Sequence, residues 1–445
     1  MTQHRQIHFA AHFPGVNQQT VWSHPDAGSQ IEFESFRKFA QIAEAGFMDY
    51  LFLAEGLRLR EQKGALHELD VAGRPNTVGV LSALAAVTEH IGLVGTMSST
   101  FNEPADIARQ LQTLNVLSDG RAGWNVVTTS NAFTGENFRK GFYLPLDQRY
   151  NRAQAVVDAA RQIWQTAPGD REHLVARHDE LLDFETAGTV PPEGLGAESG
   201  RSPMLVQAGM SPQGRDFAAK NSDVIFSHYA SFEKAQAFRA DITERLAANG
   251  RAPESLKVMP AMAIVLGDTE AEAQERSLEI RRAQVSPQTA ISFVEQVWGR
   301  DLSDHDPDGP LPSFEPTEGL AAEGWVNTYE DRFERVAKWR EISARENLSI
   351  RDIAVREYNY DQFIGTPEQV ADSIIAAVDG RAADGFTLVG HLVPGGLAEV
   401  VEKVIPILQE KGAYRTEYRQ GASLRELMGT TAAPLREQET ARTSA

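Results

Sequence analysis

The chain contains no cysteine among its 445 residues, which excludes disulfide bonds, thiolate nucleophiles and cysteine-ligated metals whatever the fold. Positive charge is scarce, because 43 Lys and Arg stand against 62 Asp and Glu, for a net charge of −19. Nucleic acids and anionic membranes require a basic face, so this balance argues against both as partners. No apolar run is long enough to cross a membrane, and residues 1–7 lack the apolar core of a signal peptide. We therefore expect a soluble cytoplasmic protein.

Short apolar segments alternate with amphipathic segments along most of the chain. We predict strands at 7–12, 47–54, 91–98, 122–128, 204–208, 224–227, 256–266 and 386–392. We predict helices at 33–45, 75–90, 103–118, 217–221, 232–249, 269–282, 329–346, 367–380 and 398–411. Continuous apolar strands that alternate with helices are typical of a parallel sheet covered on both faces. The pattern predicts an α/β fold of the TIM (β/α)8-barrel type.

The barrel is expected to form a single domain over residues 1–428. Two long additions interrupt it, at about 131–201 after the fourth strand and at about 284–361 after the seventh. The second addition is mostly polar and is a candidate lid over the functional site. Residues 429–445, rich in Thr, Ala and Glu, are predicted to form a disordered tail.

Functional residues of TIM barrels lie at the carboxyl ends of the strands. The ends predicted here are neutral and rich in hydroxyl groups, as a binding site for an uncharged heteroaromatic ring requires. No catalytic triad or metal-binding cluster is recognisable, so no metal is predicted. Three histidines lie near predicted strand ends and are candidates for direct chemistry, although a lone histidine is more often structural: His12, His228 and His391.

Residues 207–217 read Gln-Ala-Gly-Met-Ser-Pro-Gln-Gly-Arg-Asp-Phe, a strand end followed by a turn of small residues and a helix. Backbone N–H groups at the N-terminus of a helix bind phosphate, and glycine lets the phosphate approach closely. An ordinary capped turn would have the same composition. The segment alone therefore leaves both interpretations open.

The segment from Ser118 to Thr129, Ser-Asp-Gly-Arg-Ala-Gly-Trp-Asn-Val-Val-Thr-Thr, resembles the hallmark of flavin-dependent monooxygenases of the bacterial-luciferase-like superfamily. The loop at 207–214, the Arg149-Tyr150 pair and the Gly-Thr-Pro-Glu-Gln segment at 365–369 resemble the same family. The resemblance is greatest to the branch that contains nitrilotriacetate, dibenzothiophene-sulfone and long-chain alkane monooxygenases, and it covers nearly the whole chain.

This resemblance implies a two-component system. A separate NAD(P)H-dependent flavin reductase would supply reduced FMN, and the barrel protein would use O2 to oxidise a small organic substrate through a flavin peroxide. Such a system needs no protein nucleophile, because the cofactor carries the chemistry. The resemblance also implies a homo-oligomer, either a dimer or a tetramer.

The resemblance further implies roles for individual residues. Glu55 would lie near the pyrimidine edge of the flavin, and a second group would contact its ring and phosphate: Ser98, Ser99, Asn125, Thr128, Tyr150, Gly209, Met210 and Ser211. A buried structural amide remains an alternative for Asn125. Several relatives carry a histidine shortly after the fourth strand, but residues 129–138 contain none, which argues against a mechanism based on it.

Two other functions remain open from the sequence. One is a deazaflavin-dependent oxidoreductase that transfers hydride, and the other is a flavin-binding protein without catalysis. The substrate is not identified by the sequence, but the shortage of arginine at the strand ends favours a neutral or a sulfur- or nitrogen-containing organic molecule over a polyanion.

Overall fold

The computed structural model describes residues 4–14, 20–57, 59, 61–62, 64–66, 73–129, 144, 146–165, 202–317, 331–357 and 362–431. The predicted tail beyond residue 431 lies outside these residues, as does most of the first predicted addition.

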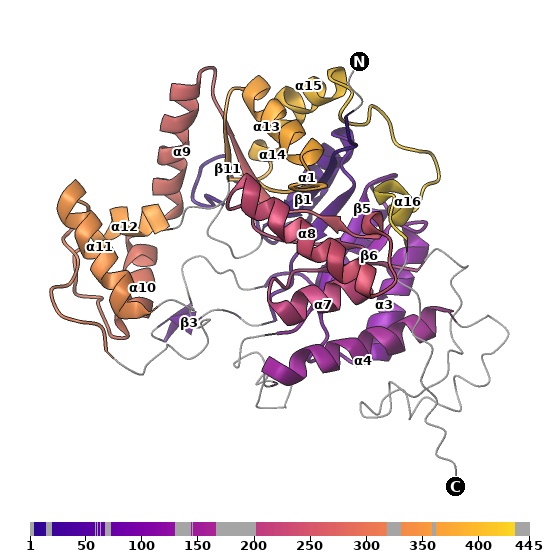
Figure 1. The fold of residues 1–445 in the computed structure, drawn as a ribbon, viewed down its shortest axis with the longest axis horizontal. Helices are drawn as coiled ribbons and strands as arrows, with labels where there is room; N and C mark the ends of the chain where they lie inside the picture. The colour runs from indigo at the N-terminus through magenta and orange to yellow at the C-terminus, as the bar shows by residue number, and fades with distance from the viewer. Residues whose placement is uncertain are drawn as a thin grey trace, which may run out of the picture.

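A parallel sheet forms the centre of the molecule (Figure 1). Its strands are β1 (His8–Phe13), β2 (Tyr50–Leu53), β5 (Gly92–Ser98), β6 (Ala122–Val127), β7 (Met204–Gln207), β8 (Val224–Ile225), β9 (Lys257–Val258), β10 (Ala261–Leu266), β11 (Gln362–Gly365) and β12 (Gly385–Val389). They lie in the order β11-β10-β12-β1-β2-β5-β6-β7-β8-β9. A separate antiparallel hairpin pairs β3 (Glu61–Gln62) with β4 (Ala65–Leu66).

No strand pairing among the described residues closes this order into a ring. However, β8 and β12 both hydrogen-bond to the segment that contains β9 and β10. The amide of Lys257 donates to the carbonyl of Asp223, next to β8, and the amide of Asp384, next to β12, donates to the carbonyl of Val258. The segment that contains β9 and β10 thus has β8 on one side and β12 on the other, as in a TIM barrel. The predicted α/β fold is confirmed.

The single strand predicted at 256–266 is wrong. Met259 and Pro260 separate β9 from β10, because a proline has no N–H group to donate to a ladder. β9 pairs with β8, whereas β10 pairs with β12 and with β11, a strand that the sequence analysis missed.

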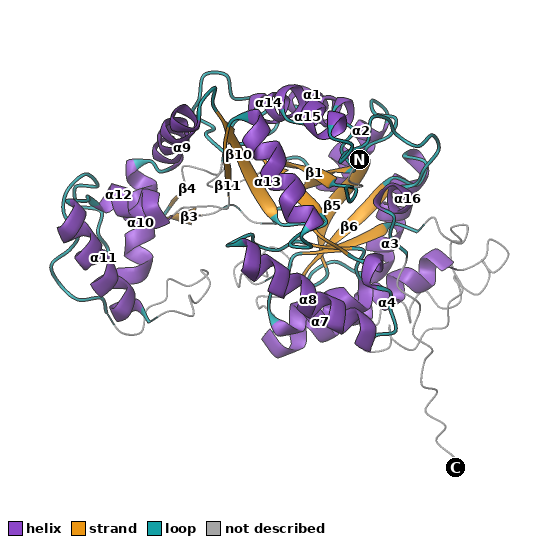
Figure 2. Ribbon diagram, turned by 45° about the horizontal axis from the view of Figure 1, so that its top comes forward, coloured by secondary structure: helices purple, strands orange, loops and turns teal. Residues whose placement is uncertain are grey.

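Helices cover the outside of the sheet (Figure 2). They are α1 (Phe33–Ala45), α2 (Thr77–Ala85), α3 (Pro104–Leu117), α4 (Leu146–Gln165), α7 (Pro212–Asn221), α8 (Phe232–Ala248), α9 (Glu270–Gln284), α13 (Pro367–Asp379), α14 (Gly395–Lys403) and α15 (Ile405–Glu410). The last two replace the single helix predicted at 398–411, which is interrupted at Val404, two residues before Pro406. The bounds of α1 agree with the predicted 33–45.

The core has an outer and an inner part. The outer part lies between the strands and helices and includes Phe9, Leu51 and Phe386. The inner part combines buried side chains of six strands or strand ends with two residues of α16 (Leu424–Met428). It includes Tyr50, Phe52, Val94, Val206, Met259, Leu424 and Met428. Because α16 side chains pack beside Gly92, at the start of β5, they fill the end of the barrel where the strands begin.

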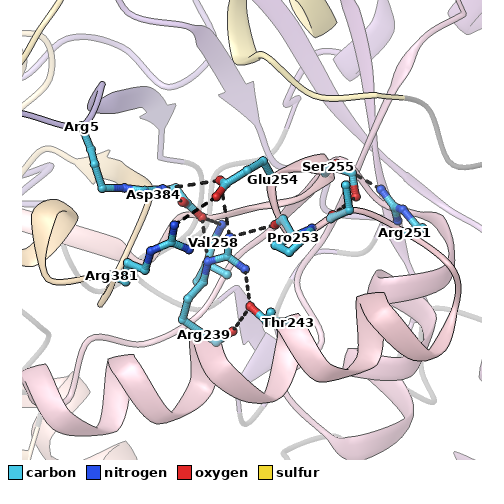
Figure 3. A network of polar contacts seen from close by, with 11 residues as sticks. Arg5, Arg239, Thr243, Arg251, Pro253, Glu254, Ser255, Val258, Arg381 and Asp384 are labelled. Carbon is cyan, nitrogen blue, oxygen red and sulfur yellow. Dashed lines mark hydrogen bonds and ion pairs between the residues drawn. The ribbon is translucent and has the colours of Figure 1, made fainter.

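Three aspartates strengthen this same end of the barrel. Asp49, Asp223 and Asp384 each precede a strand, and each accepts the backbone N–H of a residue on the neighbouring strand. Each carboxylate also pairs with an arginine from another element: Arg415, Arg425 and Arg239 respectively. Figure 3 shows the network around Asp384. The amino-terminal end of the barrel is therefore closed and structural, which leaves the carboxyl end for a functional site.

The second predicted addition forms a small helical unit of α10 (Pro287–Trp298), α11 (Arg332–Glu346) and α12 (Ile350–Glu357). Of these helices only α11, near the predicted helix at 329–346, was expected, and α10 and α12 were not predicted. The unit has its own core, in which Trp298 and Trp339 stack with ring centroids 6.1 Å apart. In both views it lies to one side of the sheet, beyond α9 and beside the β3–β4 hairpin (Figure 1, Figure 2).

Candidate active site

A row of aromatic side chains crosses the interior of the barrel at the carboxyl ends of the strands, which is called the mouth below. Along β1, Phe9 and Phe13 face the helices while Ala10 faces the interior, so His12 shares the inner face of the strand. Its ring lies 4.8 Å from that of Phe52, which in turn lies 5.0 Å from the ring of Phe226. The row therefore extends from β1 across β2 to the residue after β8.

Polar side chains lie beside this row, on the neighbouring strands β5 and β6. The Asn125 side-chain amide, 3% exposed on β6, donates to the Thr96 hydroxyl of β5 at 2.9 Å. The Asn125 Oδ1 is buried and has no hydrogen-bond partner among the described residues. Asn125 is therefore partly a structural amide, as the alternative interpretation stated, and partly a free acceptor that faces the interior.

The three predicted hydroxyl residues lie at the ends of the same two strands. The Ser98 hydroxyl lies 2.6 Å from that of Thr129, and the Ser99 hydroxyl donates to the Val127 carbonyl at 3.0 Å. Ser98 and Ser99 are buried, whereas Thr128 is half-buried. The structure thus brings Ser98, Ser99 and Thr128 together, with both serines already hydrogen-bonded inside the protein.

Glu55 follows β2 and lies beside the end of β5. Burial raises the pKa of its carboxyl to about 7, against a smaller lowering effect of the Ser98 backbone amide. Its Oε2 is buried and has no partner among the residues that the structure describes. At neutral pH this carboxyl group can therefore be present as either an acid or a carboxylate, and it has an unused hydrogen-bonding atom.

The turn between β7 and α7 is the segment for which the sequence left phosphate binding and an ordinary capped turn open. The predicted helix at 217–221 in fact begins at Pro212, with Ser211 as its N-cap. The Ser211 hydroxyl accepts the Gly214 amide at 3.1 Å. The first turn of this helix thus starts directly at the carboxyl end of β7, where its amides and its dipole favour an anion.

Tyr150, on α4, packs against this turn. Its ring lies 5.7 Å from that of Phe217. Its hydroxyl is so close to Gly209 and Gly214 that a Cβ atom on either glycine would collide with it. Met210 lies between the two glycines in the sequence, and it is 38% exposed. The structure brings Tyr150, Gly209 and Ser211 into one cradle.

Two residues of this region, Gln207 and Arg152, were not predicted from the sequence. The Gln207 amide group accepts the Gly209 N–H at 2.5 Å and donates to the Tyr150 hydroxyl at 3.4 Å, so it orders the turn. The Arg152 guanidinium donates to the carbonyls of Ser99 and Thr100 and ties α4 to the end of β5. Their positions in the sequence could have indicated these roles. Gln207 directly precedes Ala208-Gly209, and Arg152 lies one helical turn after Arg149.

The three candidate histidines have different environments. Burial lowers the pKa of His12 to about 4, and it lowers that of His391 to about 4 with a further contribution from Arg276. His391 lies against Gly396 of α14, in the outer layer of helices. His228 is exposed. Among these three histidines, only His12 has contacts that place it inside the mouth.

The described residues contain no group of three or more His, Asp or Glu side chains that could hold a metal ion. Within the same part of the chain, no helix is both long and apolar enough to cross a membrane.

The fold and this site define an α/β barrel with a glycine-containing turn and a helix N-terminus at its mouth, and the sequence matches the luciferase-like monooxygenase family over residues 13–384. The chain belongs to this family, and the prediction of a monooxygenase is confirmed. Its relatives include dibenzothiophene-sulfone monooxygenase, nitrilotriacetate monooxygenase component A and long-chain alkane monooxygenase, which confirms the predicted branch.

Individual relatives match over nearly the full length. The chain is 35% identical to N-acetyl-S-(2-succino)cysteine monooxygenase of Bacillus subtilis (strain 168), covering 96% of this chain and 97% of the relative. It is 32% identical to dibenzothiophene-sulfone monooxygenase of Rhodococcus erythropolis (strain XP), covering 96% and 98%. A riboflavin lyase solved with modified FMN and riboflavin has a TM-score of 0.73 at 28% identity, covering 97% and 98%. A reductase that depends on coenzyme F420 is more distant, with a TM-score of 0.54 and 13% identity.

Proposed function

We propose that this chain is the oxygenase of a two-component system. It takes reduced FMN from a separate NAD(P)H-dependent flavin reductase and uses O2 to oxidise a small sulfur-containing organic molecule. Reduced FMN, when bound, supplies the electrons that activate O2. The residues of the barrel bind and orient the cofactor, and they exclude water from it.

The observation that carries the proposal is the cradle at the start of α7. A phosphate group needs free amides, the positive end of a helix and close access to the backbone. The turn offers the start of α7 and close access to the backbone at Gly209 and Gly214, and the Tyr150 hydroxyl reaches the same place from α4. The amides of these two glycines are already bonded to the side chains of Gln207 and Ser211, so the remaining amides of the turn would have to bind the phosphate. Because a Cβ atom at Gly209 or Gly214 would collide with Tyr150, the cradle requires both glycines.

The mouth fits the ring system of the same cofactor. A flavin ring presents both N–H donors and carbonyl acceptors, and the mouth holds two buried oxygens without a partner among the described residues, Glu55 Oε2 and Asn125 Oδ1. Leaving such an atom unpaired costs about 1–3 kcal/mol, which a bound ring could recover. The aromatic row from His12 to Phe226 offers an apolar surface beside them.

The helical unit of α10, α11 and α12 is proposed as the lid of the site. It lies beside the β3–β4 hairpin, which follows the carboxyl end of β2 (Figure 1, Figure 2). It also has its own core, so it can move as one body. Closing over the mouth would keep water from the reacting groups.

A sulfur-containing substrate is proposed from the relatives. Two proteins that are 35% and 32% identical to this chain are named for N-acetyl-S-(2-succino)cysteine and dibenzothiophene sulfone, which both contain sulfur. We also propose that the chain forms a homo-oligomer, which light scattering after size-exclusion chromatography would test.

The decisive experiment is an anaerobic titration with reduced FMN, followed by rapid mixing with O2 and by a screen of sulfur compounds for oxygenated products. Binding and product formation are expected for the wild-type chain. Binding without any product would support a flavin-binding protein without catalysis. If reduced FMN does not bind but a reduced deazaflavin does, the alternative of hydride transfer replaces this proposal.

A further inference from the structure

The position of His12 makes it the residue that faces a ligand anchored in the cradle. In the strand order β1-β2-β5-β6-β7, the strand of His12 is four places from β7, where the cradle lies. Counted the other way, through β8, the β9–β10 segment and β12, the separation is again four places. His12 and the cradle thus lie on opposite sides of the mouth.

The surroundings of His12 leave one atom of its ring unused. The Nε2 is buried and has no hydrogen-bond partner in the described part of the chain. The ring packs on Phe52, a contact that a phenylalanine could make equally well. An unpaired buried polar atom costs about 1–3 kcal/mol, so packing alone does not account for an imidazole at this position.

The charge state of His12 suits contact with a neutral ring. Burial lowers the pKa of its imidazole to about 4, so the ring is uncharged at neutral pH. A neutral imidazole can offer either a donor or an acceptor at Nε2, depending on its tautomer. The polar edge of a flavin ring carries both kinds of partner.

We infer that the Nε2 of His12 hydrogen-bonds the edge of the flavin ring that lies farthest from the phosphate, and so positions the ring over the mouth. This inference rests on the proposed function, because it assumes that the cradle holds the phosphate of FMN. His12 is a binding and positioning residue in this arrangement. It takes up no proton and forms no covalent bond.

Two ligands distinguish the contribution of His12 to binding from that of the cradle. They are FMN and riboflavin, which has the same ring without the phosphate. His12→Phe keeps the aromatic packing and removes the hydrogen bond. We expect it to weaken anaerobic binding of reduced FMN and of reduced riboflavin by the same factor, on the order of tenfold, which is about 1.4 kcal/mol. Gly214→Ala should weaken binding of FMN alone, because riboflavin has no phosphate for the cradle to hold.

The matched control is His391→Phe, which removes the other histidine whose pKa burial lowers to about 4 but which lies against α14. Its affinities for both flavins should equal those of the wild type. His12→Asn should recover part of the affinity lost in His12→Phe, because an amide restores a donor and an acceptor. Near-ultraviolet circular dichroism would verify that each variant is folded.

A second measurement reads the imidazole directly. In protein labelled with 15N-histidine, reduced FMN should shift the His12 ring resonances in proportion to saturation and leave those of His391 in place. Wild-type affinity for both flavins in His12→Phe, or unchanged His12 resonances in FMN-saturated protein, overturns the inference while the proposed function stands. A wild-type chain that binds riboflavin and FMN equally overturns the phosphate cradle and, with it, the inference about His12. A wild-type chain that binds neither flavin overturns the proposed function as well.

Discussion

The hydroxyl group of Tyr150 occupies the space that a Cβ atom on Gly209 would need, and it lies 2.7 Å from the corresponding position on Gly214. The two glycines differ in what else stands nearby. The remaining close atoms at Gly209 belong to the Gln207 side chain, whereas those at Gly214 belong to the backbone of Gly209. Side chains can move at small cost, but a backbone that starts a helix cannot, so the two positions tolerate a methyl group differently.

We predict that Gly214→Ala weakens the binding of reduced FMN by at least about tenfold, corresponding to about 1.4 kcal/mol, and that Gly209→Ala has a smaller effect. Combining Gly214→Ala with Tyr150→Phe should not restore affinity, because the backbone collision remains. Anaerobic titration of the single and double variants measures these affinities. Equal effects at the two glycines would show that the cradle does not have the geometry described.

The turn of the cradle was predictable from the sequence because its residues are local, whereas Tyr150 reaches it from α4. Gly209, Ser211 and Gly214 follow an apolar strand within a few residues, and the spacing of small residues and the N-cap serine is visible in the sequence. The sequence placed residues 217–221 in a helix without fixing its start, which lies at Pro212, because Pro212 and Gly214 are poor helix formers in the interior of a helix. Proline is nevertheless favoured in a first turn, which the structure shows.

Glu55 should make the ligand-free protein less stable as the pH rises. Its folded pKa of about 7 lies above the ordinary value of 4.5, so the unfolded chain ionises first. Between these values the folded state binds more protons than the unfolded state, and the free energy of unfolding falls with pH. Glu55→Gln removes this penalty. It should be more stable than the wild type by about 1–3 kcal/mol above pH 7 and nearly equal to it below pH 4.5.

Urea unfolding of both proteins at pH 4 and pH 8 measures the difference. Glu89→Gln is the control, because the Glu89 side chain is 88% exposed and its removal should change neither value. If the difference in the free energy of unfolding between Glu55→Gln and the wild type is the same at pH 4 and at pH 8, the surroundings do not raise the pKa of the Glu55 carboxyl.

The unpaired atoms of the mouth could not be predicted from the sequence. Whether Glu55 Oε2, Asn125 Oδ1 and His12 Nε2 have partners depends on side chains from strands far apart in the chain. For the same reason the three histidines looked equivalent, although His228 is exposed and His391 packs against α14. The helices α10 and α12 were missed for a different reason. α10 follows α9 after two residues and α12 follows α11 after three, and the apolar side chains of both pack in the shared core around Trp298 and Trp339.

At the closed end of the barrel, Arg425→Met should destabilise the protein without affecting the flavin. Asp223 is 1% exposed and receives two hydrogen bonds from Arg425, at 3.1 and 3.0 Å. Removing the arginine leaves a buried charge without its cation, which typically costs about 3–5 kcal/mol. Because the pair lies at the end of the barrel opposite the cradle, the affinity for reduced FMN should stay within about twofold, or 0.4 kcal/mol, of the wild type.

Arg345→Met provides the comparison, since it breaks an exposed pair with Glu346 and should cost less than about 1 kcal/mol. The double variant Asp223→Asn with Arg425→Met should recover part of the stability, because it removes both buried charges. Urea denaturation measures all three. If Arg425→Met costs no more than Arg345→Met, the buried pair does not stabilise the closed end.

The helical unit should lose order before the barrel does. Trp339 is 1% exposed and stacks on Trp298, so Trp339→Ala creates a large cavity in the core of the unit and should cost about 3–5 kcal/mol of its local stability. Phe333, also on α11, is 36% exposed, and Phe333→Ala should have little effect. Hydrogen exchange should accelerate in α10, α11 and α12 of Trp339→Ala, while exchange in β1, β5 and β6 stays as in the wild type.

The same two variants test whether this unit is a lid. If the unit excludes water from the site, disordering it should let reduced FMN that is bound in the mouth yield hydrogen peroxide on mixing with O2. We expect Trp339→Ala to release several times more peroxide per product molecule than Phe333→Ala, with the affinity for reduced FMN unchanged because the cradle is intact. Peroxide and product are quantified from the same reaction. Faster hydrogen exchange in α10–α12 together with an unchanged peroxide yield would show that the unit folds as described but does not cover the site.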